Sequence, residues 1–175
     1  ERAANAGLSG QFNANVGDNI TSKFENDITG LGGLKKSGNG TLILSGNNDY
    51  QGDTTVEGGT LEIQKENGSP ITIKSGGTLV TTPTTVIGLR NYSGNLLPVN
   101  VKNEGGTLEN RGSGAVITGN YDAIAGSVTK AQIGTKLTVR GTVNLNGGNT
   151  TLQALSNGKY ITAKTMSSAV IEAEK

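Results

Sequence analysis

The residues best suited to catalysis are two pairs of glutamates, Glu57 with Glu62 and Glu104 with Glu109. Two carboxylates held at a fixed separation can cleave a glycosidic bond, one as an acid and the other as a base or nucleophile. Both pairs, however, are the ends of the same repeated six residues, at 57–62 and 104–109. Charged residues on the outer face of a repeat protect exposed strands from aggregation. We therefore favour a structural role for these glutamates and keep a polysaccharide-active enzyme as the less favoured alternative.

Other side chains that support catalysis or metal binding are absent or scattered. The chain contains no histidine and no cysteine, which excludes Ser-His-Asp and Cys-His catalysis, thiol chemistry and the usual zinc sites. The aspartates are isolated, and the sequence has neither a calcium-binding nonapeptide repeat nor an EF-hand loop. We therefore expect no catalytic residue, no metal ligand and no cofactor here, and we predict that this segment is not an enzyme.

Partner binding is a further kind of chemistry to consider. Arg90 and Tyr92 lie close together in the sequence, and a tyrosine that projects from a loop can contact a glycan or a host protein. The lysines and arginines are otherwise scattered and the formal net charge is +1, so no surface for nucleic acid is predicted. No apolar run approaches the roughly 20 residues that cross a bilayer, and we expect no direct membrane insertion.

The composition indicates which elements must position these residues. Glycine accounts for 28 of the 175 residues, aromatic residues for 3% and hydrophobic residues for 33%. Helical cores rely on leucine, methionine and aromatic side chains, whereas glycine, asparagine and threonine dominate here and the apolar residues are mostly valine, isoleucine and leucine. Such residues favour short strands and tight turns. The core must therefore be thin and spread along the chain.

One short motif recurs along the chain. Gly-Gly-Thr-Leu occurs three times and a truncated Gly-Thr-Leu once. The motif residues are Gly40, Thr41, Leu42, Gly59, Thr60, Leu61, Gly77, Thr78, Leu79, Gly106, Thr107 and Leu108. Successive threonines are 19, 18 and 29 residues apart, which indicates a repeat whose last interval carries a loop insertion at 81–97. Arg90 and Tyr92 fall in this insertion.

Between the motifs, apolar and polar residues alternate as in strands with one buried face. Ile71 and Ile73 share one face, while Thr72 and Lys74 share the other. An antiparallel sandwich shows the same alternation, but a solenoid also explains the repeated motif. We therefore predict an all-β fold, a right-handed parallel β-helix, over residues 31–175. Its motif leucines would stack in the interior about 4.8 Å apart, its motif threonines outside, and its motif glycines at a corner with an unusual φ.

The first thirty residues differ from the repeats. Residues 1–6 are helix-like and end at Gly7, which indicates the end of a helix that belongs to an upstream domain. Phe12, Phe24 and Ile28 are apolar positions in a polar stretch. We therefore predict that residues 1–30 form a junction and an irregular N-terminal cap.

Residues 27–63 closely resemble the passenger-associated strand repeat of autotransporters. The residues that carry the resemblance are Leu34-Lys35-Lys36-Ser37-Gly38-Asn39-Gly40-Thr41-Leu42, Ser45-Gly46-Asn47-Asn48-Asp49-Tyr50 and Gly58-Gly59-Thr60-Leu61. Upstream, Phe24-Glu25-Asn26-Asp27-Ile28 is similar to the junction after the catalytic domain of subtilisin-like autotransporter proteases. Looser similarity to later passenger turns extends through 143–148 and 158–163.

The resemblance implies an N-terminal serine protease of the subtilisin type, a β-helical stalk and a C-terminal outer-membrane barrel in one chain. The upstream protease, the downstream β-helix and the barrel would then be the partners of this segment, which would lie outside a Gram-negative bacterium or on its surface. Neither protease motifs nor barrel strands occur in these residues. The resemblance therefore carries over no catalytic residue and implies a stalk, with an adhesin surface that binds a host protein or glycan as the alternative.

Overall fold

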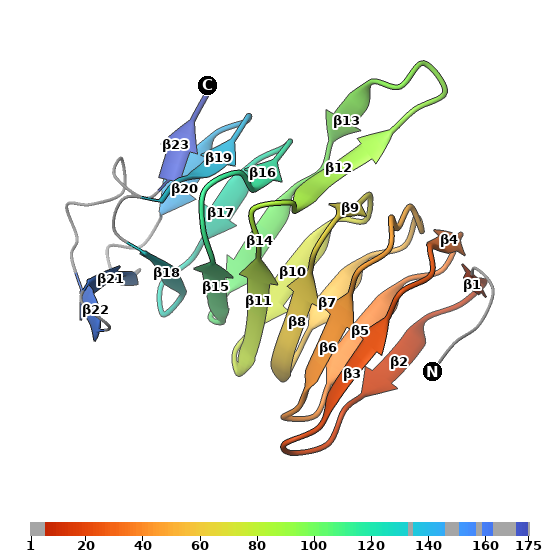
Figure 1. Cartoon of the computed structure of the whole chain (residues 1–175), viewed down its shortest axis with the longest axis horizontal. Helices are drawn as coiled ribbons and strands as arrows, with labels where there is room; N and C mark the ends of the chain where they lie inside the picture. Colours follow the sequence, from red (N-terminus) through yellow and green to blue (C-terminus); the bar gives the residue numbers. More distant parts are fainter. Residues whose placement is uncertain (1–5, 133–134, 146–150, 157–158, 163–170, 175) are drawn as a thin grey trace.

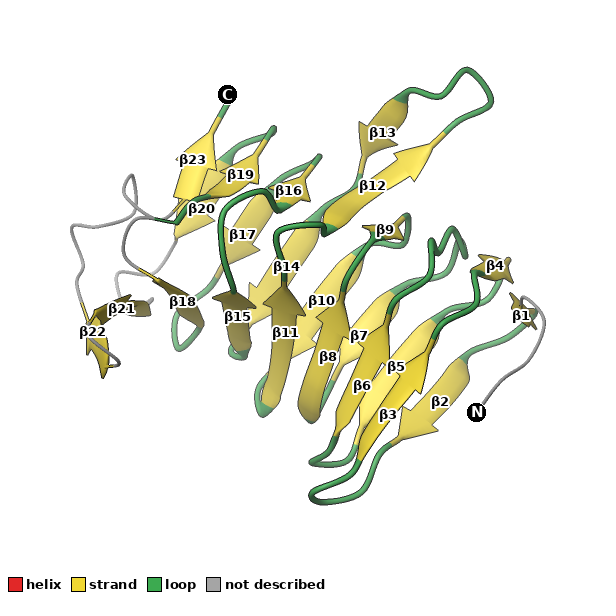
Figure 2. Ribbon diagram, viewed as in Figure 1, coloured by secondary structure: helices red, strands yellow, loops and turns green. Residues whose placement is uncertain are grey.

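The structure is a computed structural model that describes residues 6–132, 135–145, 151–156, 159–162 and 171–174. All of its regular elements in these ranges are β-strands, and they wind into a solenoid whose N-terminal turns lie at one end and C-terminal turns at the other (Figure 1, Figure 2). No helix in the described ranges is long and apolar enough to span a membrane. The predicted all-β, right-handed parallel β-helix is confirmed.

In the described residues, three sheets of six or more strands run along the solenoid. The first consists of β2 (Phe12–Asn15), β5 (Leu34–Ser37), β7 (Thr54–Val56), β10 (Ile71–Lys74), β14 (Val101–Glu104), β17 (Tyr121–Ala123) and β20 (Val143–Leu145). The second consists of β3 (Thr21–Phe24), β6 (Thr41–Leu44), β8 (Gly59–Ile63), β11 (Gly77–Thr81), β15 (Thr107–Asn110), β18 (Val128–Gln132), β21 (Thr151–Ser156) and β22 (Lys159–Thr162). The third consists of β9 (Glu66–Asn67), β12 (Val86–Arg90), β13 (Leu96–Pro98), β16 (Val116–Ile117), β19 (Leu137–Val139) and β23 (Ile171–Ala173).

Neighbouring strands in the first sheet are one turn apart in the chain and pair in parallel. Two hairpins depart from this pattern in the described residues, because β13 pairs antiparallel with β12 and β22 pairs antiparallel with β21. The core follows the alternation of the sequence. Ile71 and Ile73 are buried, whereas Lys74 on the opposite face is exposed. Each turn thus contributes a few apolar side chains to one narrow interior.

Polar side chains also occupy this interior, where they form hydrogen bonds with one another. The hydroxyl of Tyr50 lies 2.6 Å from Oγ1 of Thr54, which in turn lies 2.7 Å from Oγ of Ser69. Further along, the hydroxyl of Tyr121 contacts Oγ1 of Thr129 and accepts a hydrogen bond from Asn103. A buried hydroxyl or amide costs little when it is hydrogen-bonded, so these groups fit a core of otherwise apolar residues.

The first turn pairs with the second as later turns do. β2 and β3 pair in parallel with β5 and β6, and β1 (Ala6–Leu8) pairs with β4 (Ile28–Gly30). Ala6, expected at the end of a helix, is instead in β1, because its backbone pairs with that of Ile28. Residues 1–5 lie outside the described residues. Phe12 and Phe24 line an apolar hollow of about 130 Å³ at this end of the core, and the predicted division at residue 30 stays a prediction.

Candidate functional site

The motif leucines lie in one interior row. Leu42 pairs with Leu61, Leu61 with Leu79, and Leu79 with Leu108, each in parallel register. Leu42 is 8% exposed and the other three have no exposed surface. The row continues to Thr129, whose hydroxyl is satisfied by Tyr121. Four successive turns therefore place a leucine directly above the previous one.

The motif threonines lie beside this row on the opposite face. Thr41, Thr60, Thr78 and Thr107 are in parallel register with one another, and each is partly exposed. The strands β6, β8, β11 and β15 therefore repeat an outward threonine followed by an inward leucine from turn to turn. Uniform register is what a solenoid needs to add one turn upon another.

Glycine is needed at the motif positions for a reason other than the one predicted. We expected an unusual φ at each, but of the four only Gly59 has a positive φ, of 61°. In two copies the preceding glycine has it instead, with φ of 92° at Gly76 and 98° at Gly105. A Cβ at Gly77 would overlap the carbonyl oxygen of Val56, and the other motif glycines, Gly40, Gly59 and Gly106, face similar backbone obstacles. Close approach between successive turns is therefore the feature that all four share.

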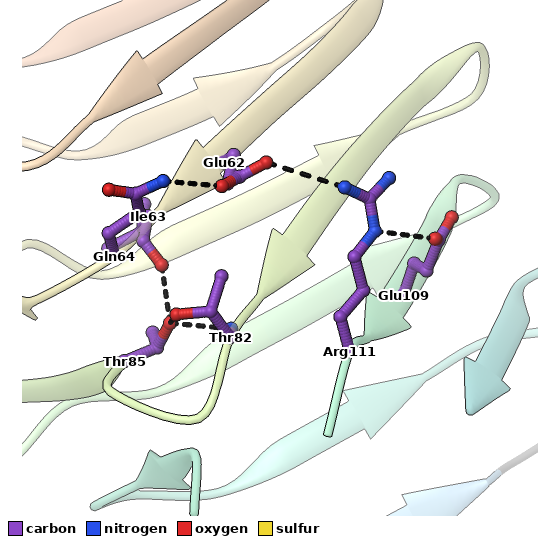
Figure 3. Close-up of polar contacts among 7 residues, drawn as sticks. All are labelled: Glu62, Ile63, Gln64, Thr82, Thr85, Glu109 and Arg111. Atoms are coloured by element: carbon purple, nitrogen blue, oxygen red, sulfur yellow. Dashed lines mark hydrogen bonds and ion pairs between the residues drawn. The ribbon is translucent and has the colours of Figure 1, made fainter. Parts of the chain in front are cut away.

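The repeated glutamates have basic partners. Glu104 lies 2.7 Å from Lys74, and Glu57 lies 3.6 Å from Lys35. Figure 3 shows the guanidinium of Arg111 between Glu62 and Glu109, at 3.4 Å and 2.8 Å respectively. These ion pairs neutralise the carboxylates in place. The arrangement suits a structural outer face better than a pair of catalytic acids.

Figure 3 also shows polar contacts within single turns and one more that joins successive turns. Gln64 donates to Glu62 at 2.7 Å, and the hydroxyl of Thr85 donates to the carbonyl oxygen of Ile63 in the preceding turn. The same hydroxyl accepts a hydrogen bond from the backbone N–H of Thr82 at 2.7 Å. Side chains on this flank therefore hold the turns to one another.

The candidate binding residues lie on the hairpin of β12 and β13, which projects from the solenoid (Figure 1) and overlaps the segment predicted as an insertion. Arg90 donates to both carboxylate oxygens of Glu66, the shorter contact being 2.6 Å, and to the carbonyl oxygen of Gly94. The hydrogen bond and charge of Glu66 raise the pKa of Arg90. Tyr92, near the tip, is fully exposed. Arg90 thus anchors the hairpin, while Tyr92 presents an aromatic surface.

A polar hollow of about 270 Å³ lies at the base of this hairpin. Side chains from three successive turns line it: Asp27 and Thr29, then Asn47 and Asp49, then Glu66, with Arg90 from the hairpin. Because Arg90 is held by Glu66, the remaining carboxylates give the hollow a negative character.

Sequence reasoning did not identify three buried polar residues. Tyr50 and Tyr121 are enclosed in the core, and burial raises the pKa of each to about 12, despite hydrogen bonds that act the other way. Lys36 also has no exposed surface, and burial lowers its pKa. Inward and outward residues alternate along a strand, so Lys36, two residues after the buried Leu34, lies on the same face.

Comparison with known proteins agrees with this geometry. Residues 34–63, which run from β5 to β8, match the family described as the passenger-associated-transport-repeat. An extracellular serine protease of Serratia marcescens is 52% identical over 56 residues, which is 32% of this chain and 5% of that protein. The Neisserial autotransporter lipoprotein NalP of Neisseria meningitidis is 44% identical over 61 residues, 35% of this chain and 6% of that protein.

The adhesin BmaC autotransporter of Brucella suis is 40% identical over 70 residues, 38% of this chain and 2% of that protein. The matched stretches thus span only a small part of each of these relatives. The predicted resemblance to an autotransporter passenger repeat is confirmed. Over part of its length the chain is similar to an extracellular serine protease and to an autotransporter lipoprotein.

Proposed function

We propose that this chain, which contains an autotransporter passenger repeat, is a structural stalk in the secreted passenger of a Gram-negative autotransporter. It would hold an upstream subtilisin-like serine protease away from the cell surface and support the folding and secretion of the passenger. The observation that carries this proposal is the unbroken parallel register of Leu42, Leu61, Leu79 and Leu108 across four turns.

That register supports a role in folding for a physical reason. Each turn of a solenoid contacts only its neighbours, so a folded turn offers the strand edges and the apolar face on which the next turn forms. A chain that emerges at the surface in order can then fold one turn at a time. The ion pairs of the repeated glutamates on its flank support a structural rather than an enzymatic role for the same surface.

The partners of the stalk would be other parts of the same chain. The names of the Serratia and Neisseria relatives, an extracellular serine protease and an autotransporter, support an upstream protease, an outer-membrane barrel and an extracellular or cell-surface location. The protease would act at its own catalytic residues, and this segment would contribute distance and folding support.

Deletion of residues 31–110 from the full-length protein tests this proposal. We expect less folded passenger at the cell surface, while each molecule that is displayed keeps its turnover of a small peptide substrate. Surface abundance and turnover per displayed molecule are measured separately. Normal display with lost turnover per molecule would place the segment in the catalytic apparatus and would exclude the stalk.

A second candidate function is binding at the projecting hairpin. The full exposure of Tyr92, on a hairpin that Arg90 holds to Glu66, favours it, and one relative is named an adhesin. An exposed aromatic ring beside polar residues suits a host glycan or protein. Replacing Tyr92 with serine should then abolish adhesion without changing stability, whereas equal adhesion by both proteins would exclude this function.

A further inference from the structure

Lys36 is a charged residue inside the solenoid. It lies on β5 between Ala14 of the preceding turn and Val56 of the following turn, and it has no exposed surface. Its Nζ donates to the carbonyl oxygens of Ser37 at 2.8 Å, Gly38 at 3.0 Å and Gly58 at 3.0 Å. The ammonium group therefore uses all three of its protons on backbone oxygens.

Those three oxygens come from two different turns. Ser37 and Gly38 end β5 and begin the corner toward β6, whereas Gly58 lies at the equivalent corner between β7 and β8, one turn later. The cradle around the ammonium is thus complete only when the turn of β7 and β8 has docked on the turn of β5 and β6. Before that docking, Nζ must either stay hydrated or lie in the interior without its full set of acceptors. Burying an ammonium group without hydrogen-bond partners costs free energy.

The neighbouring Lys35 makes a different kind of contact, an exposed ion pair. Lys35 points to the outer face, is partly exposed and lies 3.6 Å from Glu57 of the next turn. Exposed pairs of this kind add little to stability. Lys36 instead has no exposed surface and makes charge-assisted hydrogen bonds, which are stronger than those between neutral groups. The two adjacent lysines join the same two turns, one from outside and one from inside.

We propose that Lys36 is an internal lock, an ammonium group of the chain itself that closes the junction between the turn of β5 and β6 and the turn of β7 and β8. The lock lies within the matched passenger repeat, since residues 34–63 include both Lys36 and Gly58. Docking of the turn of β7 and β8 and burial of the ammonium occur together, so the junction closes cooperatively. The proposal concerns the solenoid alone and holds whether or not the parent protein is a protease.

A Lys36 that only fills space would behave differently from a lock. Replacement of a buried charged residue by an apolar one of similar shape can be neutral or even stabilising, because the cost of desolvation disappears. If Lys36 only fills space, a neutral side chain of its length should serve at least as well. If it is a lock, the carbonyl oxygens of Gly38 and Gly58 lose a donor that they need, and the junction opens more often.

The absence of cysteine from the chain permits an isosteric test. Lys36→Cys is alkylated in denaturant with 2-bromoethylamine, which restores an ammonium at lysine length, or with 1-iodopropane, which places a methyl group there. Both proteins are refolded and hydrogen exchange is followed at two amides that bridge the turns, those of Glu57 and Thr60, which donate to Lys36 and Gly40. The amide of Gly141, which donates to Gly119 in a distant turn, is the internal control.

We expect the aminoethylated protein to exchange like the unmodified chain and the propylated protein to exchange at least about tenfold faster at Glu57 and Thr60, which corresponds to about 1.4 kcal/mol. Gly141 should not change. Equal or slower exchange in the propylated protein would overturn the lock. The same alkylations of Lys35→Cys should leave the exchange of all three amides unchanged.

If the propylated protein fails to refold, the unmodified chain still decides the matter. Amine-reactive labelling followed by mass spectrometry compares Lys36 with Lys35 in native buffer and in denaturant. We expect Lys36 to react at least about a hundredfold more slowly than Lys35 in the native protein and equally fast in denaturant, since reaction requires opening of the junction. Equal rates in the native protein would overturn the proposal.

Discussion

The hydroxyl of Tyr121 lies 2.6 Å from Oγ1 of Thr129, inside the solenoid and directly beyond Leu108 in the interior row. Thr129 occupies the row position that Leu108 occupies one turn earlier. Tyr50 and Thr54 form the same kind of contact, also at 2.6 Å, several turns before. The interior therefore accepts a polar residue in an apolar row where a buried tyrosine supplies the hydrogen-bond partner.

The buried tyrosines make stability fall at alkaline pH. Burial raises the pKa of Tyr50 and Tyr121 to about 12, above the ordinary value near 10. Between these values the unfolded chain loses protons that the folded chain keeps, so the free energy of unfolding decreases as pH rises from 10 to 12 and is unaffected by these groups below pH 10. Each tyrosine should contribute a loss of about 2 to 3 kcal/mol at pH 12.

Tyr121→Phe isolates one of these contributions. We expect a loss of about 1 kcal/mol at pH 7, because Thr129 and Asn103 lose their partner, but a shallower decline between pH 10 and 12. Urea unfolding from pH 8 to 12 measures both. Parallel curves for the two proteins across this interval would contradict the assignment of Tyr121 to the core.

The two faces of the strands should differ sharply in their tolerance of charge. Leu79→Asp buries an unpaired carboxylate in the leucine row and should cost at least about 3 kcal/mol. Thr72→Asp lies on the outer face of β10 and should change the free energy of unfolding by less than about 1 kcal/mol. Strand-dominated circular dichroism and urea titration of both variants check this, and similar losses would refute the assignment of faces.

The corner glycines should be sensitive for steric reasons. Gly77→Ala places a methyl group against the backbone carbonyl of Val56 and should cost at least about 2 kcal/mol, because backbone must move. Gly17→Ala is the matched control, since nothing lies within 4 Å of the added carbon and its φ is not in the left-handed region. Thermal unfolding of both variants separates the effects, and a tolerant Gly77 would show that turn spacing is adjustable.

The sequence predicted the leucine row because one motif recurs at nearly constant spacing, and parallel stacking of identical motifs satisfies every copy at once. The reason predicted for the motif glycines was wrong. A positive φ and a close backbone approach both select glycine. Only the three-dimensional neighbours of Gly77 show that close approach is the cause there. We did not predict a buried Lys36, although its spacing of two residues from Leu34 is compatible with the inner face. The carbonyl oxygen of Gly58 that accepts its proton is 22 residues away and has no signature in sequence.

The geometry of the candidate binding hairpin was predictable only in part. A longer repeat interval indicated an insertion, and Tyr92 is indeed exposed, but the pairing of Arg90 with Glu66 depends on two turns lying side by side. The buried tyrosines could not be told from exposed ones by composition. Tyr50 and Tyr92 have the same chemistry and opposite environments, which the fold alone determines.

The most direct test of the proposed stalk compares two point variants in the full-length protein. Leu79→Asp disrupts the interior row, while Thr72→Asp adds the same charge on the outer face. Surface-displayed passenger is quantified on intact cells, and peptide turnover is divided by the displayed amount. We predict that Leu79→Asp lowers display several-fold with unchanged turnover per displayed molecule, and that Thr72→Asp changes neither. Normal display of Leu79→Asp with reduced turnover per molecule would contradict the account.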